Sequence, residues 1–479
     1  MKKTLLKICT CIILAAMLMS VVCITSSAAE EPAAEWDGTT IASGFASGDG
    51  SYGNPYVISN PAEWNYFATF VTRNGVSNKC YFILTSDLDF GGHTISPVGT
   101  QNNQFKGTFD GRGHTVKNFK MNSETEGDFV ALFANVNGST AHVKNLSVKN
   151  ATISGNKKMY VATIAAFLTN GKITNVNVDS TVKLELKGDN VSGSTGGIAA
   201  RNYGTIQYAV SAATINVENS HEKNCNFVGG ITGGTGKGTG IVIDCIARGT
   251  ITTTTANTGG ITGILGVTNL GRIENCYNLA SVSSTYSVSG LVGKIQTDDG
   301  NDIKNCINLS TSITGPAAKA GTIVGQVTNA FTATGAQSVE VQGIGFTGDA
   351  GDKDISACDM TVILDDAAME KVSALEATIA DHAAEEAKIV YEESADSSTS
   401  DDDGDVSFDD FPDETDDSSN SSIGTKPEVK ETSAPEATAE TEESEGGCGA
   451  SLTCLAGLTV TATLACTALT IKKSKKEDQ

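Results

Sequence analysis

The sequence predicts an all-β chain folded as a parallel β-helix solenoid, and an internal repeat carries this prediction. Residues 259–310 hold one pattern twice, first as GGITGILGVTNLGRIENCYN and then as SGLVGKIQTDDGNDIKNCIN. Gly260 aligns with Gly290 and Asn275 with Asn305, so both halves of the unit recur after 30 residues. A fixed period of this size, with two short apolar runs per unit and no helical spacing, is typical of a solenoid that buries its core only by stacking. The 51 glycines and an aromatic content of 6% fit the same fold, because turns outnumber bulky side chains.

The second apolar run of the unit recurs along the chain, each time with a polar or turn-forming residue before its last position. Strict alternation along a strand would place Ile273 and Cys276 on opposite faces, so the chain must bend between them. Asn275 lies at this bend, and Asn tolerates the left-handed backbone region better than most residues do. We therefore expect an architectural ladder whose amides hydrogen-bond from rung to rung. Seven rungs are predicted, with bend residues at Asn118, Asn145, Asn175, Tyr208, Asp244, Asn275 and Asn305.

The run Gly-Leu-Val-Gly at residues 290–293 resembles the GLUG repeat of bacterial surface proteins, as do the Gly-Ile-Thr-Gly runs at residues 230–233 and 260–263. The resemblance covers roughly residues 129–348, where the motif recurs in register with the second apolar run. The unit at residues 196–200 and the rung at Tyr208 depart from it, so the early coils are expected to be less regular. The resemblance implies a right-handed parallel β-helix in a secreted or surface protein, and it implies no particular reaction.

Residues 1–29 are predicted to be a signal peptide. A basic start with three lysines is followed by an apolar run and by small residues that end at Ala29, where cleavage is expected. A lipoprotein anchor at Cys23 is rejected, because the preceding position needs a small residue and holds Val22.

A membrane anchor is predicted at residues 446–479. Residues 450–471 carry no charge and would form a helix of about 33 Å, long enough to cross the hydrocarbon core. The lysines that follow form a basic tail expected in the cytoplasm. Residues 392–445 hold 20 acidic and 2 basic residues, a net charge of −18, and are predicted to be a disordered acidic linker that acts as a stalk.

Residues 30–128 are predicted to form an N-terminal cap and the first coils. Asn60, Pro61 and Glu63 make up a helix-start signal with a capping box. Four apolar residues then follow at helical spacing, at Trp64, Phe67, Ala68 and Val71. One amphipathic helix ahead of a solenoid is expected to cover the core and edge of the first coil.

The frame Asp-x-x-Gly-His-Thr occurs at Asp89 and again at Asp110, 21 residues later, which predicts two short coils with equivalent turns. A pair of catalytic sites is the alternative, because His93 and His114 follow the aspartates and Arg112 lies nearby. We favour the turns, since duplication gives both histidines the same surroundings, whereas a general acid and a general base need different ones.

Residues 129–350 are predicted to form the repeat coils. Cys245, Cys276 and Cys306 fall on one rung position, where the strand spacing is too wide for a disulfide, so a reduced, buried ladder is expected. Two glycine-rich runs imitate nucleotide-binding loops. The run at residues 236–238 lacks the P-loop pattern, and the run at residues 343–348 lacks a following helix, so both are interpreted as turns.

Residues 351–391 are predicted to be a C-terminal capping segment with a second helix, which begins at Asp365 or Asp366 and packs on the last coil. The apolar face of this helix is expected at Met369, Val372, Leu375 and Ile379, with His382 at its boundary.

The sequence therefore predicts a single-pass protein of a Gram-positive bacterium, with its N-terminal ectodomain displayed at the cell surface. The favoured function is non-catalytic adhesion, with a glycan or a host matrix protein as the extracellular ligand. A surface-displayed polysaccharide lyase or glycoside hydrolase is the alternative, which would need paired carboxylates in one groove or Ca²⁺ held by aspartates. No catalytic, cofactor-binding or metal-binding residue is predicted, and no cofactor. A net charge of −23 without a basic stripe argues against a nucleic-acid partner.

Overall fold

The computed structural model describes residues 35–391 with short gaps. These gaps are residues 75–76, 124, 126–128, 158, 189–192, 220–225, 255, 268–269, 297–300, 311, 317–319, 328–330, 335, 340–358 and 363–365. The chain divides into two compact units, Met1–Asp401 and Asp402–Gln479, and the described residues all belong to the first. The predicted signal peptide, acidic linker and membrane anchor lie outside the described residues. Neither of the two described helices is long and apolar enough to cross a membrane.

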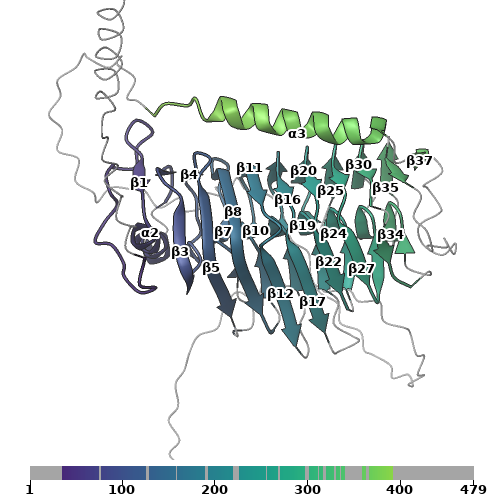
Figure 1. The fold of residues 1–479 in the computed structure, drawn as a ribbon, viewed down its shortest axis with the longest axis horizontal. Coiled ribbons are helices and arrows are strands. Elements are labelled where there is room, and N and C mark those ends of the chain that lie inside the picture. The colour runs from purple at the N-terminus through teal and green to yellow at the C-terminus, as the bar shows by residue number, and fades with distance from the viewer. Residues whose placement is uncertain are drawn as a thin grey trace, which may run out of the picture. The chain divides into compact units, whose positions relative to one another are not determined.

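The described residues form an all-β parallel solenoid of about seven turns, accompanied by two helices (Figure 1). Every described strand pair runs parallel, with strands of successive coils beside each other, as in the pairing of β25 with β30. The strands gather into one 23-stranded sheet and two seven-stranded sheets. The predicted all-β parallel solenoid with two helices is therefore confirmed, while its right-handedness, the acidic stalk and the transmembrane helix stay predictions.

The 23-stranded sheet carries the corners discussed below. It comprises β1 (Tyr56–Ile58), β2 (Tyr81–Leu84), β3 (Leu88–Thr94), β4 (Thr108–Asp110), β5 (Thr115–Ser123), β8 (His142–Gly155), β11 (Lys172–Val178), β12 (Lys183–Gly188), β15 (Thr205–Gln207), β16 (Val210–Ser211), β17 (Thr214–Asn219), β20 (Gly240–Ile243), β21 (Ile246–Ala247), β22 (Thr250–Thr253), β25 (Gly271–Glu274), β26 (Tyr277–Asn278), β27 (Ser281–Ser284), β30 (Asn301–Lys304), β31 (Ile307–Asn308), β32 (Ile313–Thr314), β35 (Phe331–Thr334), β36 (Gln337–Val339) and β37 (Asp359–Val362).

The two seven-stranded sheets each take one strand from successive coils. The first comprises β7 (Phe133–Val136), β10 (Ala165–Leu168), β14 (Ala199–Asn202), β19 (Thr232–Gly236), β24 (Thr262–Val267), β29 (Val292–Ile295) and β34 (Val324–Val327). The second comprises β6 (Phe129–Val130), β9 (Met159–Ala162), β13 (Gly193–Gly196), β18 (Asn226–Gly229), β23 (Ala256–Gly259), β28 (Ser287–Ser289) and β33 (Ala320–Gly321).

The helix α2 (Pro61–Asn74) covers the core of the first coils, as predicted. Asn60 Oδ1 accepts a hydrogen bond from the Glu63 backbone N–H at 3.0 Å, and Glu63 Oε2 accepts one from the Ser59 N–H at 2.6 Å. This capping arrangement starts the helix where the sequence indicates. Trp64 and Phe67 are fully buried and pack against aromatic rings of β2, β4 and β7 at centroid distances of 4.6 to 6.3 Å. The helix therefore seals the apolar end that stacking leaves open.

A left-handed residue bends the chain at the same corner of six successive coils. The strands around this corner lie in register through β8, β11, β15, β20, β25 and β30. Because of the bend, Ile273 and Cys276 both point into the core and are fully buried. The predicted bend is confirmed, since φ lies between +49° and +57° at Asn145, Asn175, Tyr208, Asp244, Asn275 and Asn305.

Asn118 does not belong to this corner ladder, although its φ of +58° is also left-handed. Strand β5 pairs with β8 so that Phe119 lies beside Ala151, which places Asn118 beside Asn150 at a second corner. Asn150 Nδ2 donates a hydrogen bond to Asn118 Oδ1 at 2.6 Å. The seven-rung prediction is wrong at this position. Both corners carry the same four-residue pattern, in which an apolar residue, any residue and Asn are followed by another apolar residue.

The glycines of the Gly-x-x-Gly runs let backbones and side chains approach each other closely. A Cβ at Gly263 would lie 2.2 Å from the backbone nitrogen of Val228, which belongs to the other seven-stranded sheet. A Cβ at Gly260 would lie 2.2 Å from Cγ of Asn278. Both positions therefore require glycine, because any side chain would prevent this close approach.

The two Asp-x-x-Gly-His frames make the same local turn but occupy different places in their coils. In each frame the aspartate Oδ1 accepts a hydrogen bond from the backbone N–H two residues later, at 3.0 Å for Asp89 and 2.8 Å for Asp110. Asp89 lies on β3, which pairs with β5, whereas Asp110 lies on β4, which pairs with β2 and β8. Strand β4 follows β2 after 27 residues, from Tyr81 to Thr108. The prediction of two 21-residue coils with equivalent surroundings is therefore wrong.

The predicted cysteine ladder is confirmed. Cys245, Cys276 and Cys306 are buried and free, and the Cys276 backbone N–H donates to Cys306 Sγ at 3.5 Å. Burial raises the pKa of the Cys245 and Cys306 thiols, which favours their neutral form. Residues 237–239 form the turn between β19, which ends at Gly236, and β20, so the predicted turn is confirmed, while residues 343–348 lie outside the described residues.

The helix α3 (Asp366–Glu386) is not confined to the last coil, so that prediction is wrong in its extent. It runs back along the outer face of the 23-stranded sheet toward the N-terminal coils (Figure 1). Lys371 Nζ, near its start, donates to Gln337 of β36 at 3.3 Å, and Glu386, at its end, contacts Lys144 of β8. The helix thus spans most of the described coils.

Asn275→Leu should lower the free energy of unfolding by about 1 to 3 kcal/mol. Leucine is strained at a φ of +49°, and the hydrogen bond from Asn275 Nδ2 to Asp244 Oδ1 is lost. Asn275→Gly is the matched control, because it loses the same hydrogen bond without the strain and should cost less. Chemical denaturation of both variants tests this, and an unchanged stability of the leucine variant would contradict the corner assignment.

Gly293→Ala should destabilise the solenoid by about 1 to 3 kcal/mol, because the new Cβ would lie 2.5 Å from the Thr258 backbone nitrogen. Gly44→Ala is the control, since no heavy atom lies within 4 Å of the added methyl group. Thermal unfolding midpoints of the two variants should therefore differ clearly. Equal midpoints would mean that the two seven-stranded sheets do not pack as closely as described.

Candidate functional site

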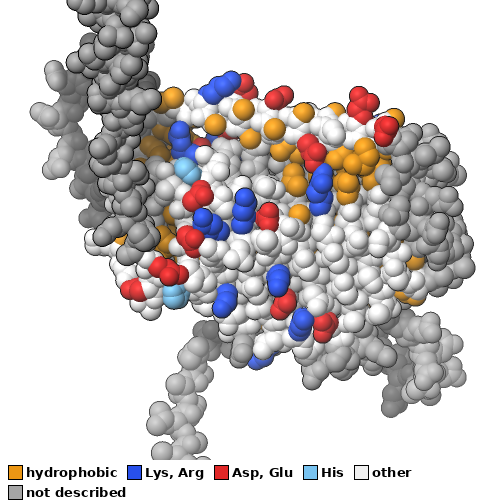
Figure 2. Space-filling view, in the orientation of Figure 1, with side chains coloured by type: hydrophobic (Ala, Val, Ile, Leu, Met, Phe, Trp, Pro, Cys, Tyr) orange, Lys and Arg blue, Asp and Glu red, His pale blue; other side chains and the backbone are white. Residues whose placement is uncertain are grey.

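Residues 366–391, called the strap, comprise α3 and a tail that ends at Tyr391. The first half of α3 packs on apolar side chains that point outward from the 23-stranded sheet, and Figure 2 shows apolar side chains gathered along this line. The predicted apolar face is confirmed at Val372 and Leu375 but wrong at Met369, which is 39% exposed. Ala368 takes its place. The buried members of this cluster are Ile246, Ile307, Leu309, Ala368, Val372 and Leu375.

Polar contacts hold the second half of the strap. Glu376 forms an ion pair with Arg248, and the ring of His382 lies 4.4 Å from the ring of Tyr208. At the end of α3, Lys144 Nζ donates to Glu386 Oε2 at 2.6 Å. The Lys144 ammonium is nearly buried, so this pair is shielded from solvent more than a surface ion pair would be.

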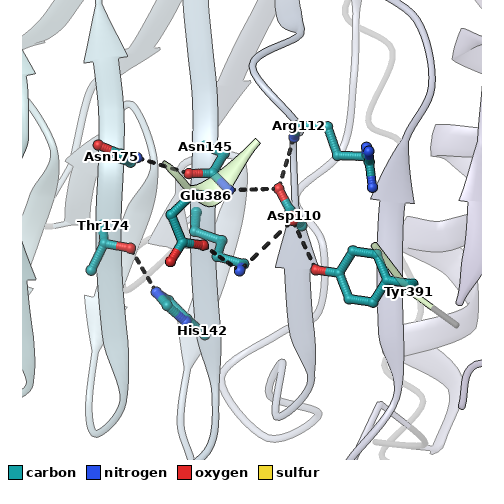
Figure 3. Close-up of polar contacts among 9 residues, drawn as sticks. Asp110, Arg112, His142, Asn145, Thr174, Asn175, Glu386 and Tyr391 are labelled. Atoms are coloured by element: carbon teal, nitrogen blue, oxygen red, sulfur yellow. Dashed lines mark hydrogen bonds and ion pairs between the residues drawn. The ribbon is translucent and has the colours of Figure 1, made fainter. Parts of the chain in front are cut away.

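The tail of the strap ends on a buried carboxylate (Figure 3). Asp110 is 2% exposed, and its Oδ2 accepts a hydrogen bond from the Tyr391 hydroxyl at 2.8 Å. Its Oδ1 accepts from the Arg112 backbone N–H and from Asn145 Nδ2, both at 2.8 Å. Lys144 Nζ lies 3.8 Å from Oδ2. Both oxygens of Asp110 are therefore engaged, and the residue serves as an anchor for the strap.

The electrostatics of this anchor favour fixed protonation states. Burial and the neighbouring Asp110 carboxylate raise the pKa of Tyr391, so its hydroxyl stays a neutral donor. Burial alone would raise the pKa of Glu386, but the hydrogen bond and the charge of Lys144 outweigh it and hold that pKa below the ordinary value. The neutral phenol of Tyr391 therefore donates to Asp110, and the Glu386 carboxylate pairs with Lys144.

The structure does not bring the predicted His/Asp candidates together. His93 packs edge-on against Trp36 at 5.7 Å, and His114 Nδ1 lies 3.4 Å from Asp87 Oδ1. Asp89 accepts hydrogen bonds from Asn118 Nδ2. Only Asp110, with Arg112 beside it, lies at the strap. Within the described ranges, no three His, Cys, Asp or Glu side chains lie close enough together to hold a metal ion.

A groove of about 500 Å³ lies between the second half of the strap and the 23-stranded sheet. One wall is the apolar face of α3, where alanines leave space. The other wall is formed by corner residues of β8 and β11 and by the start of β16. The lining residues are Arg112, Gly113, Asn145, Leu146, Ser147, Asn175, Val176, Asn177, Tyr208, Val210, Glu376, Ile379, Ala380, Ala383 and Ala387.

Asn175, which lines this groove, carries a buried hydrogen-bond acceptor without a partner. Two successive amides of the corner ladder donate toward the N-terminal coils, from Asn145 Nδ2 to Asp110 Oδ1 at 2.8 Å and from Asn175 Nδ2 to Asn145 Oδ1 at 3.0 Å (Figure 3). The next rung is Tyr208, which has no amide to donate, so Asn175 Oδ1 is buried without a hydrogen-bond partner. Asn175 is only 8% exposed. Such a group costs about 1 to 3 kcal/mol unless a ligand satisfies it.

His142 lies on β8, two residues before Lys144 of the anchor. Its Nε2 lies 2.7 Å from Thr174 Oγ1 (Figure 3). Burial, together with the charge of Lys144, lowers the pKa of His142 from 6.5 to about 4. The imidazole is therefore neutral at physiological pH.

Sequence reasoning missed Lys144, Glu386 and Tyr391, and it treated the ladder purely as architecture. Glu386 and Tyr391 are hundreds of residues from their partners, and no local pattern marks them. One signal was present in the sequence: Tyr208 departs from the asparagine ladder, and the structure shows that this departure leaves Asn175 unpaired.

No protein-family model matches the chain, so membership of the GLUG family stays a prediction. A stretch of 145 residues is 32% identical to a protein of Evansella cellulosilytica provisionally described as a Gly-rich membrane protein, and it covers 28% of this chain and 16% of that protein. Another similarity, 27% identity over 165 residues, is to halomucin of Haloquadratum walsbyi, and it covers 31% of this chain and 2% of halomucin. The chain thus spans less than a fifth of the length of either relative.

Two solved structures are similar to this chain. One is provisionally described as an immunoglobulin A1 protease from Bacteroides ovatus, with 23% sequence identity and a TM-score of 0.45 over 70% of this chain and 90% of that chain. The other is an IgA1 protease with 17% identity and a TM-score of 0.38, over 59% of this chain and 21% of that chain. At these values the names of the two structures say nothing about the chemistry of this chain.

Acidification should loosen the strap in two stages. His142 has a lowered pKa, so the stability it contributes is complete above pH 6.5 and is lost as the pH falls toward about 4. The pKa of Glu386 lies below its ordinary value of 4.5, so its contribution is lost only as the pH falls below that value. Hydrogen–deuterium exchange of the α3 amides, corrected for intrinsic rates, measures both stages.

Two variants separate these contributions. His142→Asn should remove the upper stage, and Glu386→Gln should remove the lower one. Exchange rates in α3 that do not change with pH in the wild type would contradict the described contacts of the strap.

Proposed function

We propose that the solenoid is the binding module of a surface-displayed adhesion protein, and that the groove under the strap binds a short neutral stretch of glycan. The observation that carries this proposal is the buried, unpartnered Oδ1 of Asn175 at the wall of a groove of about 500 Å³. A volume in this range is typical of sites that bind small ligands. The groove thus offers both space and an unused hydrogen-bond acceptor.

The groove lining offers both polar and apolar groups, which suits a sugar with its hydroxyl groups and its apolar C–H face. Sugar hydroxyl groups donate and accept hydrogen bonds, and Asn175 Oδ1 supplies an acceptor, while Arg112 and Asn177 supply donors. The apolar wall of Ala383 and Ala387 and the ring of Tyr208 offer surfaces for the C–H face of a pyranose ring. A purely apolar ligand would leave Asn175 unsatisfied, so a hydroxyl-bearing ligand is favoured.

Surface display is supported from outside the described residues. The predicted signal peptide and the predicted C-terminal anchor indicate an exported, tethered protein. A relative that matches part of the chain is described as a membrane protein. With the solenoid outside the cell, a glycan of a host surface or matrix would be within reach.

Asn175→Ala should weaken the binding of a neutral disaccharide about tenfold, because the buried acceptor is lost. Titration calorimetry with lactose, maltose, cellobiose and N,N′-diacetylchitobiose on the full chain measures this. Asn216→Ala is the matched control, since Asn216 bonds Glu218 and does not line the groove. No binding of any of these sugars by the folded wild type, or equal losses in both variants, would contradict the proposal.

Polysaccharide cleavage is the second candidate, because Asp110 and Glu386 bring two carboxylates to the ammonium of Lys144 beside the groove. Glycoside hydrolases use such a pair. The engagement of Asp110 by Tyr391 and Asn145 supports binding over cleavage. Incubation with polysaccharides decides between them: a released product that disappears with Asp110→Asn would make the protein an enzyme.

A further inference from the structure

A row of aromatic side chains lies on the two seven-stranded sheets and on the residue that follows β14, away from the strands that carry the strap. This aromatic row consists of half-buried rings. Four of them contact one another at centroid distances of 4.6 to 6.1 Å, and Phe227 is connected to them through Arg201. The closest stacking is between Phe129 and Phe167, at 4.7 Å and 16°. The members of the row are Phe129, Tyr160, Phe167, Tyr203 and Phe227.

Arg201 inserts its guanidinium into this row. It lies on β14, in register with Phe167 of β10, and is only 8% exposed. Its Cζ lies 5.0 Å from the ring centre of Phe227 and 5.9 Å from that of Tyr160. Such contacts offset part of the cost of burying the charge.

Ser194 provides the space for this guanidinium. On the neighbouring sheet Ser194 lies in register between Tyr160 and Phe227, the two rings that flank Arg201. A Cβ added at Gly233 would lie 2.8 Å from Ser194 Cβ, so the two sheets are close together here. The small serine side chain therefore leaves a notch between two rings, and the guanidinium fills it.

Two hydrogen-bond donors in this notch are unused. Arg201 Nη1 and Ser194 Oγ are both buried without a hydrogen-bond partner. A guanidinium can only donate hydrogen bonds, so only an acceptor can satisfy Nη1. Among the described residues no acidic side chain forms an ion pair with Arg201, and burial lowers its pKa. A buried cation without a counter-ion is costly, and an anion would relieve that cost.

We propose that Arg201 and Ser194 form a second glycan site, which binds the carboxylate of an acidic sugar whose ring packs on the aromatic row. A carboxylate is planar and accepts through two oxygens, which matches the planar guanidinium and the serine hydroxyl. Lys237 lies over the ring of Tyr203 at 5.7 Å and adds a second positive charge beside the row. Half-buried aromatic rings offer the flat apolar surface that a pyranose ring needs. This site is separate from the groove under the strap. It binds negatively charged sugars, whereas the groove binds neutral sugars.

The test compares two ligands that differ only at C6. Methyl β-D-glucuronide and methyl β-D-glucoside are titrated into the full chain, and binding is followed by calorimetry and by ligand-observed NMR. The wild type should bind the glucuronide about tenfold more tightly than the glucoside, because only the glucuronide carries the carboxylate. Arg201→Gln should abolish this preference, and Asn175→Ala in the groove should leave the affinity for the glucuronide unchanged.

Ser194→Ala keeps the test decisive if Arg201→Gln does not fold. This variant removes one donor, keeps the charge and the packing, and should weaken glucuronide binding several-fold with little change in thermal stability. Equal affinity of the folded wild type for both ligands, or no binding of either, would overturn the proposal. So would a glucuronide affinity that survives Arg201→Gln or is reduced by Asn175→Ala as strongly as by Ser194→Ala.

Discussion

The left-handed corner in each coil is the constraint on which the rest of the structure depends. In a regularly alternating strand, Ile273 and Cys276 would point to opposite faces. The bend at Asn275, like its equivalents in other coils, places both of these apolar side chains in the core. Only residues that tolerate a positive φ can hold this position, so short polar side chains collect there. Stacking then places these side chains in line on one outer face. The face that carries the ladder is also the face on which the strap packs.

The ladder explains why the groove lies where it does. Its amides donate in one direction, from Asn175 through Asn145 to Asp110, and Asp110 in turn holds Tyr391 at the end of the strap. Tyr208 interrupts the series, which leaves Asn175 with an unused oxygen, and its ring contacts the ring of His382 instead. The same interruption therefore fixes the strap and creates a polar group for a ligand. The rung at Tyr208 therefore affects both the packing of the strap and the proposed binding of a ligand.

The fold class, the capping helix, the corner and the cysteine ladder could be predicted, because each rests on local chemistry repeated at a fixed period. Asn118 was assigned to the wrong corner, since apolar spacing alone cannot tell one corner of a coil from another. Met369 was expected on the buried face of α3 because helical periodicity favours it, but Ala368 faces the sheet. The strap anchor could not be predicted, since Tyr391 meets Asp110 across 281 residues of sequence. The groove depends on that contact, so it could not be predicted from the sequence either.

The rung at Tyr208 has no amide to donate, so Asn175 Oδ1 is left free for a ligand. Tyr208→Asn tests it most directly, because an asparagine at this left-handed position can donate to Asn175 Oδ1 and complete the ladder. The measurement is the affinity of the full chain for the disaccharides that the wild type binds, together with the thermal midpoint. We predict an affinity about tenfold weaker, while the new hydrogen bond offsets part of the stability that is lost with the ring contact between Tyr208 and His382. An unchanged affinity in a folded, equally stable variant would contradict the account.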